Sequence, residues 1–563
     1  MYKLHYVLLL ICGFTFKLVS AQSPRPNIIL VIGDDMRFDT YGPTGGPTWF
    51  SCASINRVAN EGANFENYFC VYSLCIPSRS SIMTGLYPHS NGAYDNISTY
   101  NSSLPTIASI LHGAGYHTAM IGKFHAYYTP QPGWDYWLSK YGETDYTDPK
   151  FNYNGTTKII YGHTTAIIND SSEAVLAAID TPFFMNIGHL VAHKNIVPEP
   201  QYDGIYHNKA MPIPSDFYKY PKDYPSFLYE RGYYLAQVQL NDDYEKYFEG
   251  VRSIDDNMDS IFSILQSRGL LGNTLIIFTS DNGSMYGEHL LAGKGVAYDP
   301  SIRQPMFIRY PAWFSPGTEI ANSIGLHVDL APTILEAAGI DATPYHFQGI
   351  SLHKQATGEL NRNLMLYENI KLYADEGNDD VPTPSIRSVR DFNYKYISYQ
   401  CQSVTEEFFD LTTDPMENTN LIHDPSYAVL IDQYRNKLDS MRAALSDTLS
   451  IDTLEKSCYL KTSKKFNAGD LGHTGDIFHL RVSPNPVQDE FFAEFFSGES
   501  GNVRIQVYNN LGQVMYDVQS NVQAGLNEVP LNGQAWPPGL YYLRVQSGDK
   551  VVSESMAKRA VVN

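Results

Sequence analysis

"PNIILVIGDDMRFDTYG", residues 26–42, is an apolar run that ends abruptly in two carboxylates, Asp34 and Asp35. A second stretch, "NTLIIFTSDNGSMYGEH" at residues 273–289, repeats this design and ends in an Asp-Asn pair. Runs that are apolar at every position are typical of parallel strands buried on both faces, and parallel strands need helices between them. The two stretches therefore predict an α/β fold.

Periodic segments of the kind that cover such a sheet lie around these two strands. Helices are predicted at residues 54–65, 104–116, 247–270 and 328–340. Together with the strands they indicate a layered α/β domain from about residue 24 to about residue 375. Residues 195–230 are rich in Pro and Tyr and show no clear periodicity, and we expect them to border the active site.

The rest of the chain changes character twice. Residues 386–400 and 406–421 predict antiparallel strands, and residues 426–449 predict an amphipathic helix packed on them. The last part consists of short alternating strands with Asn-Pro and Gly turns, which indicates a small β-sandwich. The expected divisions are a small α+β subdomain at residues 376–460, a linker at residues 461–476 and the sandwich at residues 477–563.

The charge balance excludes one class of partner. The 563 residues contain 40 Lys and Arg against 60 Asp and Glu, which gives a formal net charge of −20. A nucleic-acid-binding protein would need a basic face, so nucleic acid is not expected as a partner. An anionic substrate stays open, because a small basic pocket fits within an acidic surface.

The N-terminus predicts export. Lys3 precedes an apolar run, and the small residues Ser20 and Ala21 follow it, so residues 1–21 are typical of a cleaved signal peptide. The run is too short for a comfortable membrane span, and no later stretch is long and apolar enough to cross a bilayer. Cys12 follows Ile11 rather than a small residue, which makes a lipid-anchored cysteine the weaker alternative. We expect an exported, soluble mature protein.

Removal of a signal peptide would leave five cysteines, an odd number in an oxidising compartment. At least one thiol is then unpaired. If that thiol is Cys75, a bridge between Cys401 and Cys458 is favoured, because both lie in the same late region. Whether Cys52 pairs with Cys70 stays open.

The polar residues that end the two strands predict a metal site. Ligands gather at the carboxyl ends of strands in α/β sheets, so Asp34, Asp35 and Asp281 should meet if the strands are neighbours. Three carboxylates need a cation to offset their repulsion, and Asn282 completes an all-oxygen set that suits Ca²⁺ first, Mg²⁺ second and zinc poorly. The alternative for an Asp-Asp pair is a helix cap or a surface pair.

Cys75 lies in the stretch "SLCIPSRSSIMTG", residues 73–85, and its soft thiolate is a poor partner for a hard cation. This stretch resembles the signature of the type I sulfatases of the alkaline-phosphatase superfamily, in which the cysteine is oxidised to formylglycine (3-oxoalanine). "GYHTAMIGKFH", residues 115–125, resembles the second signature of that family. The resemblance covers about residues 25–421. It implies a large mixed-sheet domain, a formylglycine-generating maturase as partner, and hydrolysis of sulfate esters.

The same resemblance implies roles for five more residues. Lys123 and Lys294 match the sulfate-binding lysines, and Arg79 matches the arginine that holds the formylglycine. His193 matches the histidine over the sulfate and is the expected general acid. His125 matches the histidine beside the formylglycine and would take its proton when sulfate leaves.

Three further residues are candidates for a sugar subsite. Arg37 stands where relatives vary, and His189 precedes His193 in "GHLVAHKN", where many relatives have a proline beside the histidine. His289 follows the second strand. For each of these three, a purely structural role is an equal alternative.

The C-terminal segments "SPNP", "VYNNLGQVM" and "PPGLYYLRV" resemble the sorting domain of the type IX secretion pathway of Bacteroidota. This resemblance implies passage through the periplasm and release, or display at the cell surface, by the type IX machinery. It also suggests a sulfated oligo- or polysaccharide substrate, with algal ulvan, fucoidan or carrageenan first and animal glycosaminoglycans second. The alternative for the tail is a carbohydrate-binding module.

Two other functions stay open at this point. One is a phosphodiesterase or phosphonate hydrolase of the same superfamily, although the sequence contains no further Asp/His metal cluster of the kind a phosphate dianion would favour. The other is a non-catalytic polysaccharide-binding protein, against which the intact Cys75, Arg79 and Lys123 argue.

Overall fold

The computed structural model describes residues 25–142, 145–215, 225, 228, 237–370, 384–400, 405–449, 477–483, 490–497, 500–523, 525–548 and 550–558. It divides into two compact units, Met1–Cys458 and Tyr459–Asn563. The expected signal peptide and linker lie outside the described residues, as do Cys401 and Cys458. The pairing predicted for those two cysteines therefore stays a prediction.

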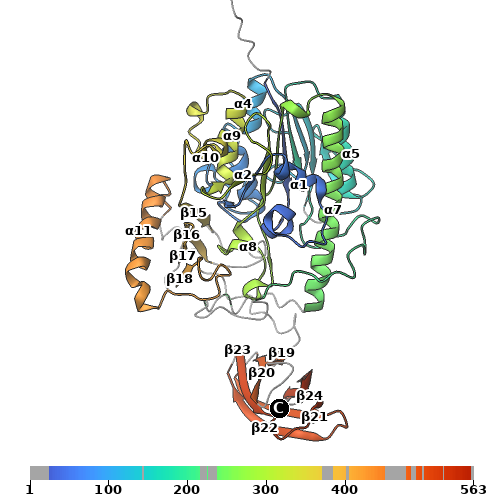
Figure 1. Ribbon diagram of the computed structural model, residues 1–563, viewed down its shortest axis with the longest axis vertical. Coiled ribbons are helices and arrows are strands. Elements are labelled where there is room, and N and C mark those ends of the chain that lie inside the picture. Colours follow the sequence, from blue (N-terminus) through green and yellow to red (C-terminus); the bar gives the residue numbers. More distant parts are fainter. Residues whose placement is uncertain are drawn as a thin grey trace, which may run out of the picture. The chain divides into compact units, whose positions relative to one another are not determined.

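A ten-stranded mixed sheet forms the centre of the first unit (Figure 1). Its middle is parallel and runs in the order β9 (Thr274–Ser280), β1 (Asn27–Gly33), β8 (Phe183–Gly188), β4 (His117–Gly122) and β5 (Tyr136–Lys140). Beyond β9 lie β12 (Met306–Arg309), β2 (Ala63–Phe65) and β13 (Thr318–Ile320), and beyond β5 the hairpin of β6 (Lys150–Tyr153) and β7 (Thr156–Ile159). The predicted α/β class with a mixed sheet is confirmed.

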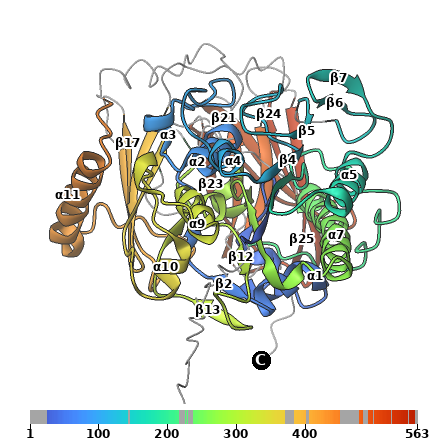
Figure 2. The same ribbon diagram turned by 90° about the horizontal axis from the view of Figure 1, so that it is seen from above.

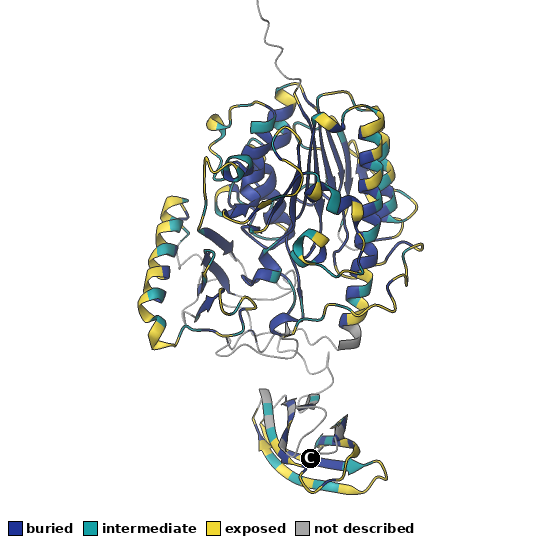
Figure 3. Ribbon diagram, viewed as in Figure 1, coloured by how far each residue is buried: buried dark blue, intermediate teal, exposed yellow. Residues whose placement is uncertain are grey.

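Helices cover both faces of this sheet because its central strand is apolar on both sides. Ile29 and Val31 of β1 belong to one core, and the intervening Ile28 and Leu30 belong to another. One face packs against α1 (Ala53–Asn60), α5 (Thr164–Ala178) and α7 (Gln237–Ser267), and the other against α2 (Cys75–Thr84), α4 (Ile107–Gly113) and α9 (Leu330–Ala337) (Figures 1 and 2). Figure 3 shows the buried strands between helices whose outer faces are exposed.

Helix α2 is buried at every position, including its Ser and Arg residues. Its first residue is Cys75. It ends at Gly85, whose φ of 65° is the left-handed conformation that glycine adopts without strain, and the Gly85 N–H closes the last turn on the Ser81 carbonyl at 2.9 Å. A side chain at Gly85 would also meet the Phe347 ring at 2.5 Å. The helix that carries Cys75 is thus fixed inside the domain.

A smaller four-stranded sheet follows. Its strands are β15 (Met365–Asn369), β16 (Ser385–Arg390), β17 (Tyr394–Gln400) and β18 (Thr405–Asp410), and each pair of neighbours is antiparallel. Helix α11 (Ala428–Ala444) buries Ile431, Tyr434 and Leu438 in the core that this sheet shares with the first unit's loops. The strands and the helix that the sequence predicted here are present.

The second unit consists of two antiparallel sheets. One contains β19 (Ile477–Ser483), β20 (Glu490–Ser497) and β23 (Gly525–Asn532), and the other β22 (Val514–Val522), β21 (Gly501–Asn509), β24 (Gly539–Ser547) and β25 (Lys550–Lys558). Residues from both sheets, among them Phe491, Ile505 and Val545, share one apolar core. This arrangement agrees with the predicted β-sandwich.

The predicted helices all differ from the observed ones at their ends, and α4, α9 and α11 are shorter than the predicted residues 104–116, 328–340 and 426–449. The helix expected at residues 54–65 ends at Asn60, and the expectation is wrong for its last three residues, which form β2 and pair with β12. Gly62 allows this close approach, because a side chain there would meet the Ile308 carbonyl at 2.1 Å. Helix α7 begins at Gln237, earlier than the periodic pattern indicated. None of the helices in the described residues has both the length and the apolar character that a membrane span requires. Cys52, Cys70 and Cys75 are buried free thiols, so Cys52 and Cys70 are not bridged to each other.

Candidate active site

The ends of β1 and β9 bring the predicted metal ligands together. The two strands pair in parallel register, with Gly33 opposite Ser280, so the residues that follow them lie side by side. The Asp35 N–H donates to Asp281 Oδ1 at 3.1 Å, and Asn282 Nδ2 donates to Asp35 Oδ1 at 2.6 Å. The carboxyl ends of the central strands therefore form one polar centre inside the domain.

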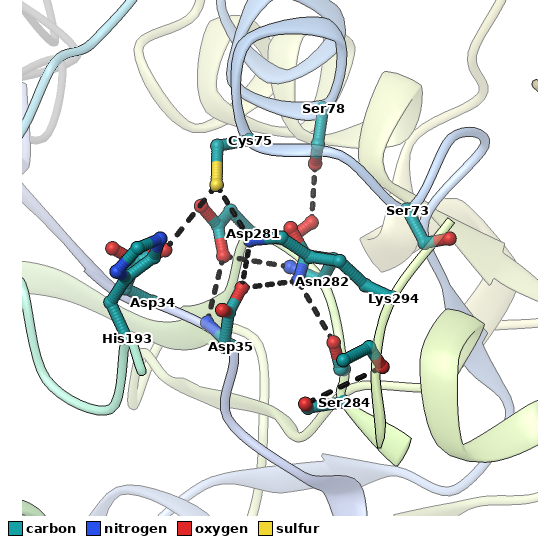
Figure 4. Close-up of polar contacts among 12 residues, drawn as sticks. Asp34, Asp35, Ser73, Cys75, Ser78, His193, Asp281, Asn282, Ser284 and Lys294 are labelled. Carbon is teal, nitrogen blue, oxygen red and sulfur yellow. Dashed lines mark hydrogen bonds and ion pairs between the residues drawn. The ribbon is translucent and has the colours of Figure 1, made fainter. Parts of the chain in front are cut away.

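Cys75 reaches this centre from the N-terminus of α2. Its Sγ lies 3.6 Å from Asp34 Oδ1, and potential ligand atoms of Asp34, Asp35 and Cys75 all lie within 4.8 Å of one another. Figure 4 shows these three side chains meeting between the strand ends. Lys294 Nζ approaches Sγ to 2.8 Å and Lys123 Nζ to 3.6 Å. The structure thus places the predicted nucleophile between carboxylates and lysines.

Each carboxylate of the centre has a cationic partner. Lys123 Nζ lies 2.5 Å from Asp34 Oδ2, Arg79 Nε lies 2.8 Å from Asp281 Oδ2, and Lys294 contacts Asp35. All of these side chains are buried. We call the following eight residues the catalytic cluster: Asp34, Asp35, Cys75, Arg79, Lys123, Asp281, Asn282 and Lys294. A buried cluster of this kind persists only because opposite charges face each other at short range.

The electrostatics of the catalytic cluster keep its carboxylates and cations charged. Burial alone would raise the pKa of Asp34, but contact with Lys123 leaves that pKa below its usual range. Burial opposes the charge of Lys294, yet Asp35 holds the pKa of Lys294 well above its usual range. Burial raises the pKa of the Cys75 thiol well above its usual range. An unmodified Cys75 is therefore a protonated thiol and a weak nucleophile.

The donor set fits a hard divalent cation. Asp34, Asp35 and Asp281 supply carboxylate oxygens, and Asn282 Oδ1 is buried without a hydrogen-bond partner among the described residues. A buried carbonyl oxygen without a partner costs free energy unless something binds it, and an oxygen set of this kind is what Ca²⁺ and Mg²⁺ prefer. The Cys75 sulfur is the exception in this set, because a hard cation prefers oxygen ligands to a soft sulfur. An oxygen group at position 75 would complete it.

The two predicted catalytic histidines lie on the loops that follow β8 and β4. Figure 4 places the His193 ring beside Asp34, and the charge of His193 helps to lower the pKa of Asp34. Tyr146 fixes this loop by donating its hydroxyl to the His193 carbonyl at 2.9 Å. His125 is buried with a φ of 70°, two residues after Lys123. The Lys123 carbonyl accepts from Arg79 Nη1 at 2.8 Å, so this turn is tied to α2.

The three residues predicted for a sugar subsite are all buried. Arg37 lies 2.8 Å from both Asp39 and Glu288, and these carboxylates hold its pKa well above the usual value although burial opposes the charge. Burial lowers the pKa of His189 to about 3 and that of His289 to about 4.

His289 also contacts two residues outside the catalytic cluster. Its Nε2 lies 2.9 Å from the Met416 carbonyl, and its ring lies 4.2 Å from that of Tyr298. These contacts describe structural surroundings for Arg37 and His289, whereas His189 is described by its burial alone. Their role in a sugar subsite stays a prediction.

Sequence reasoning missed two residues at the centre. Ser78 donates its hydroxyl to the Asp281 carbonyl and lies 2.8 Å from His327 Nδ1. Burial lowers the pKa of His327 to about 3, so the ring is neutral, and because Ser78 gives its one hydroxyl proton to Asp281, the Nδ1–H of His327 donates to Ser78 Oγ. Ser78 lies within the quoted cysteine motif and could have been found there. His327 stands in no such motif, and only the fold brings it to α2.

Three family models match the chain. Residues 26–340 match the model described as Sulfatase, and residues 287–444 match the model of the N-sulphoglucosamine sulphohydrolase C-terminal region. Residues 481–559 match the secretion system C-terminal sorting domain. The first match covers more than half of the chain and includes every residue of the catalytic cluster.

Relatives and solved structures agree with these matches. An N-acetylglucosamine-6-O-sulfatase of Bacteroides thetaiotaomicron is 28% identical, over 72% of this chain and 84% of its own length. An ulvan-active sulfatase of Formosa agariphila is 27% identical, over 78% of this chain and 86% of its own. A solved structure in complex with its substrate D-glucosamine-2-N,6-O-disulfate has 27% identity and a TM-score of 0.69, covering 75% of this chain and 99% of that one.

The fold by itself does not select the ester. A phosphonate monoester hydrolase of Agrobacterium radiobacter has a TM-score of 0.60 at 21% identity, over 75% of this chain and 96% of its own. The family match and the sulfatase relatives make that selection. The protein belongs to the sulfatase family, is a sulfuric ester hydrolase, and carries a type IX sorting domain at its C-terminus.

Proposed function

We propose that this enzyme removes sulfate from the sugars of a sulfated polysaccharide, through a formylglycine made from Cys75 and a bound Ca²⁺. The observation that carries the proposal is the position of Cys75 Sγ, 3.6 Å from Asp34 and 2.8 Å from Lys294, in a cluster otherwise made of oxygen donors and cations. A thiol that burial keeps protonated has no evident use there. An aldehyde hydrate at the same position would supply oxygen both to a cation and to the substrate sulfur.

The proposed chemistry divides between the modified residue and the side chains around it. The hydrated aldehyde supplies two hydroxyls: one attacks sulfur and displaces the sugar alcohol, and loss of the proton from the other reforms the aldehyde and releases sulfate. Asp34, Asp35, Asp281 and Asn282 would hold Ca²⁺, which eases deprotonation of the attacking hydroxyl. The three metal-ligand aspartates and the two lysines, Lys123 and Lys294, then lie in one site.

The side chains of this protein do the rest of the work. Lys123 and Lys294 neutralise the sulfate oxygens, and their burial strengthens that attraction. Arg79, anchored on Asp281, holds position 75. His193 gives a proton to the leaving sugar oxygen, and His125 takes the proton from the second hydroxyl. These residues lie on helix α2 and on the three loops that follow β4, β8 and β11 (Ala292–Gly293).

The substrate is proposed from the relatives. The ulvan-active sulfatase supports an algal polysaccharide, as the exported character of the chain does. The N-acetylglucosamine-6-O-sulfatase and the glucosamine disulfate complex support a second candidate, a 6-O-sulfated amino sugar of a glycosaminoglycan. The sorting domain supports export through the periplasm to the cell surface or beyond it, where such polymers are met.

Two measurements test the reaction and the substrate. Mass spectrometry of the Cys75 peptide from active enzyme should show formylglycine in place of cysteine, and an active enzyme with unmodified cysteine would contradict the proposal. Purified enzyme should then be incubated with defined ulvan oligosaccharides, 6-O-sulfated N-acetylglucosamine oligosaccharides and an aryl phosphate. Loss of sulfate mass from the ulvan set supports the first candidate, and loss only from the amino sugars supports the second. Preference for the aryl phosphate would contradict both.

A third measurement tests the cation. Chelation should remove activity, and Ca²⁺ or Mg²⁺ should restore it, because the donor atoms are hard oxygens. Elemental analysis distinguishes a tightly held ion that survives chelation from a protein that holds none. Restoration by zinc alone would contradict the assignment.

A further inference from the structure

The loop that carries Lys294 has little local structure to hold it. Lys294 stands between Gly293 and Gly295, whose φ values of 87° and 88° lie in the left-handed region that only glycine adopts readily. The loop connects β11 (Ala292–Gly293) to α8 (Asp299–Ile302), and the residues between them belong to no helix or strand. The 2.8 Å approach of Lys294 to Cys75 must therefore be maintained by contacts from outside the loop.

Two side chains hold the backbone beside Lys294. Ser73 Oγ accepts a hydrogen bond from the Gly295 N–H at 3.2 Å and donates to the Val296 carbonyl at 3.3 Å. Asn369 Nδ2 donates to the Gly295 carbonyl at 2.7 Å. Both polar groups of Gly295 are thus bound by side chains from other parts of the chain. Ser73 also precedes Cys75 by two residues, so its hydrogen bonds join the lysine loop to the chain of the nucleophile. Figure 4 includes Ser73 with the catalytic cluster.

The second support comes from strand β15. Tyr367 and Asn369 are alternate residues of this strand and point to the same face of the sheet. The Tyr367 hydroxyl lies 2.8 Å from Ser73 Oγ, and Asn369 Oδ1 accepts from the Tyr72 hydroxyl at 2.8 Å. All of these side chains are buried, so none can turn to water. The smaller sheet therefore reaches the loop of Lys294 through buried hydrogen bonds of Tyr367 and Asn369.

We propose that Asn369, acting with Ser73, is a positioning residue that holds Lys294 over the nucleophile. Asn369 binds the backbone of Gly295 rather than the substrate, and it acts only through the place it gives to the Lys294 ammonium group. The proposal rests on the proposed sulfate-binding role of Lys294. It assigns part of the sulfate site to the C-terminal sheet, which contains no residue of the catalytic cluster.

The first test replaces the donor. Asn369→Asp keeps the size of the side chain but places a carboxylate oxygen, which cannot donate, against the Gly295 carbonyl. We expect two constants, the inhibition constant for inorganic sulfate and the Michaelis constant for para-nitrophenyl sulfate, to rise about tenfold or more, because small displacements of a binding group cost affinity steeply.

The matched control is Asn420→Asp. Asn420 is buried in the same subdomain, and its Oδ1 accepts from Phe408 N at 3.0 Å and Ile422 N at 3.1 Å, which a carboxylate oxygen also does. Its Nδ2 donates to the Glu406 carbonyl at 3.4 Å, so this variant also loses an amide donor to a backbone carbonyl, but one that does not contact the loop of Lys294. Both constants should stay unchanged in this variant. Equal effects of the two variants would overturn the proposal.

A double-mutant cycle separates positioning from general damage. In a Lys294→Ala background, Asn369→Asp should change the sulfate inhibition constant by less than about twofold, because the group that it positions is gone. A loss of the same size in both backgrounds would overturn the proposal. If Asn369→Asp does not fold, Ser73→Ala takes its place in the cycle, since it removes the other hydrogen-bond partner of Gly295 and should show the same dependence on Lys294.

The control outcomes also separate this inference from the proposed function. If Lys294→Ala itself leaves sulfate inhibition unchanged, the sulfate-binding role of Lys294 is wrong, and the inference falls with it. If Lys294→Ala weakens sulfate binding while neither Asn369→Asp nor Ser73→Ala does, the proposed function stands and the inference alone is overturned.

Discussion

Two of the buried charge clusters among the described residues of the first unit differ in what they leave unsatisfied. One is the catalytic cluster. The other, which we call the anchor cluster, consists of Asp299, Arg390, Lys395, Glu407 and Glu417. In it Lys395 Nζ lies 2.7 Å from Asp299 Oδ1 and 2.5 Å from Glu417 Oε1, and Arg390 Nη2 lies 3.0 Å from Asp299 Oδ2. Both clusters combine carboxylates with Lys and Arg, and both lie away from water.

The anchor cluster completes itself. Its cations pair with Asp299 and Glu417, and Glu407 accepts hydrogen bonds from the hydroxyls of Tyr298 and Tyr399. The catalytic cluster instead contains a thiol among its carboxylates and cations, and Asn282 Oδ1 has no hydrogen-bond partner among the described residues. Burial and charge therefore do not distinguish an active site from a structural network. What distinguishes the active site is its ligand atoms, such as Asn282 Oδ1, that no group in the described residues satisfies and that a bound ion could.

The strongest contrast is expected from Cys75→Ala. This variant should lose hydrolysis to the limit of detection, because it removes the attacking group, while the midpoint of thermal unfolding should stay close to that of the wild type. Turnover of para-nitrophenyl sulfate and a thermal melt measure the two quantities. Full activity of the variant would remove the distinction between the clusters, since the catalytic one would then have no nucleophile.

Lys395→Met should show the opposite pattern. The change leaves Glu417 without its cation, and breaking a buried ion pair from one side costs about 3–5 kcal/mol of unfolding free energy. Denaturant unfolding measures this loss. The matched control is Lys437→Met, whose partly exposed pair with Asp391 at 3.0 Å should be worth less than about 1 kcal/mol. An equally small loss in both variants would show that the anchor cluster does not stabilise the fold.

The anchor cluster should also give the protein a pH-dependent stability. Burial raises the pKa of Glu407 to about 7 from a usual value of 4.5. The folded state then binds a proton that the unfolded state releases, so this contribution is complete below pH 4.5 and is lost as the pH rises to about 7. It amounts to about 3 kcal/mol at most. In Glu407→Gln the fall in unfolding free energy between pH 5 and pH 7 should be smaller than in the wild type, and identical slopes would contradict the assignment.

The smallest effect is expected from removing the second unit. A shortened protein of residues 22–460 should keep its turnover of a small sulfated sugar, because every residue of the catalytic cluster precedes residue 300 and the sandwich has a core of its own. Its export from the native host should fail. A large loss of turnover on the small sugar would mean that the second unit completes the active site. A loss confined to long polymers would favour a carbohydrate-binding role for it.

Sequence patterns alone indicated the layered α/β class, the C-terminal sandwich and the polar residues Asp34, Asp35, Asp281 and Asn282 at the ends of two strands. The reason is local: two wholly apolar runs that each end in carboxylates indicate buried parallel strands, and the ends of such strands share one edge of a sheet. The cysteine motif and the lysine motifs were identified differently, by their resemblance to the signatures of a known family. None of these steps needed to know which side chain touches which.

Tertiary structure decided the pairings. Asp35 and Asp281 meet across 246 positions of sequence, and Asn369 of strand β15 reaches the loop residue Gly295. No local periodicity encodes these contacts. The packing of distant elements also places His289 in contact with the Met416 carbonyl and Arg37 in an ion pair with Glu288. Local patterns indicate which face of a helix or strand is apolar. The partner of a buried charge depends instead on how distant elements pack, because that packing removes the charge from water and brings the opposite charge to it.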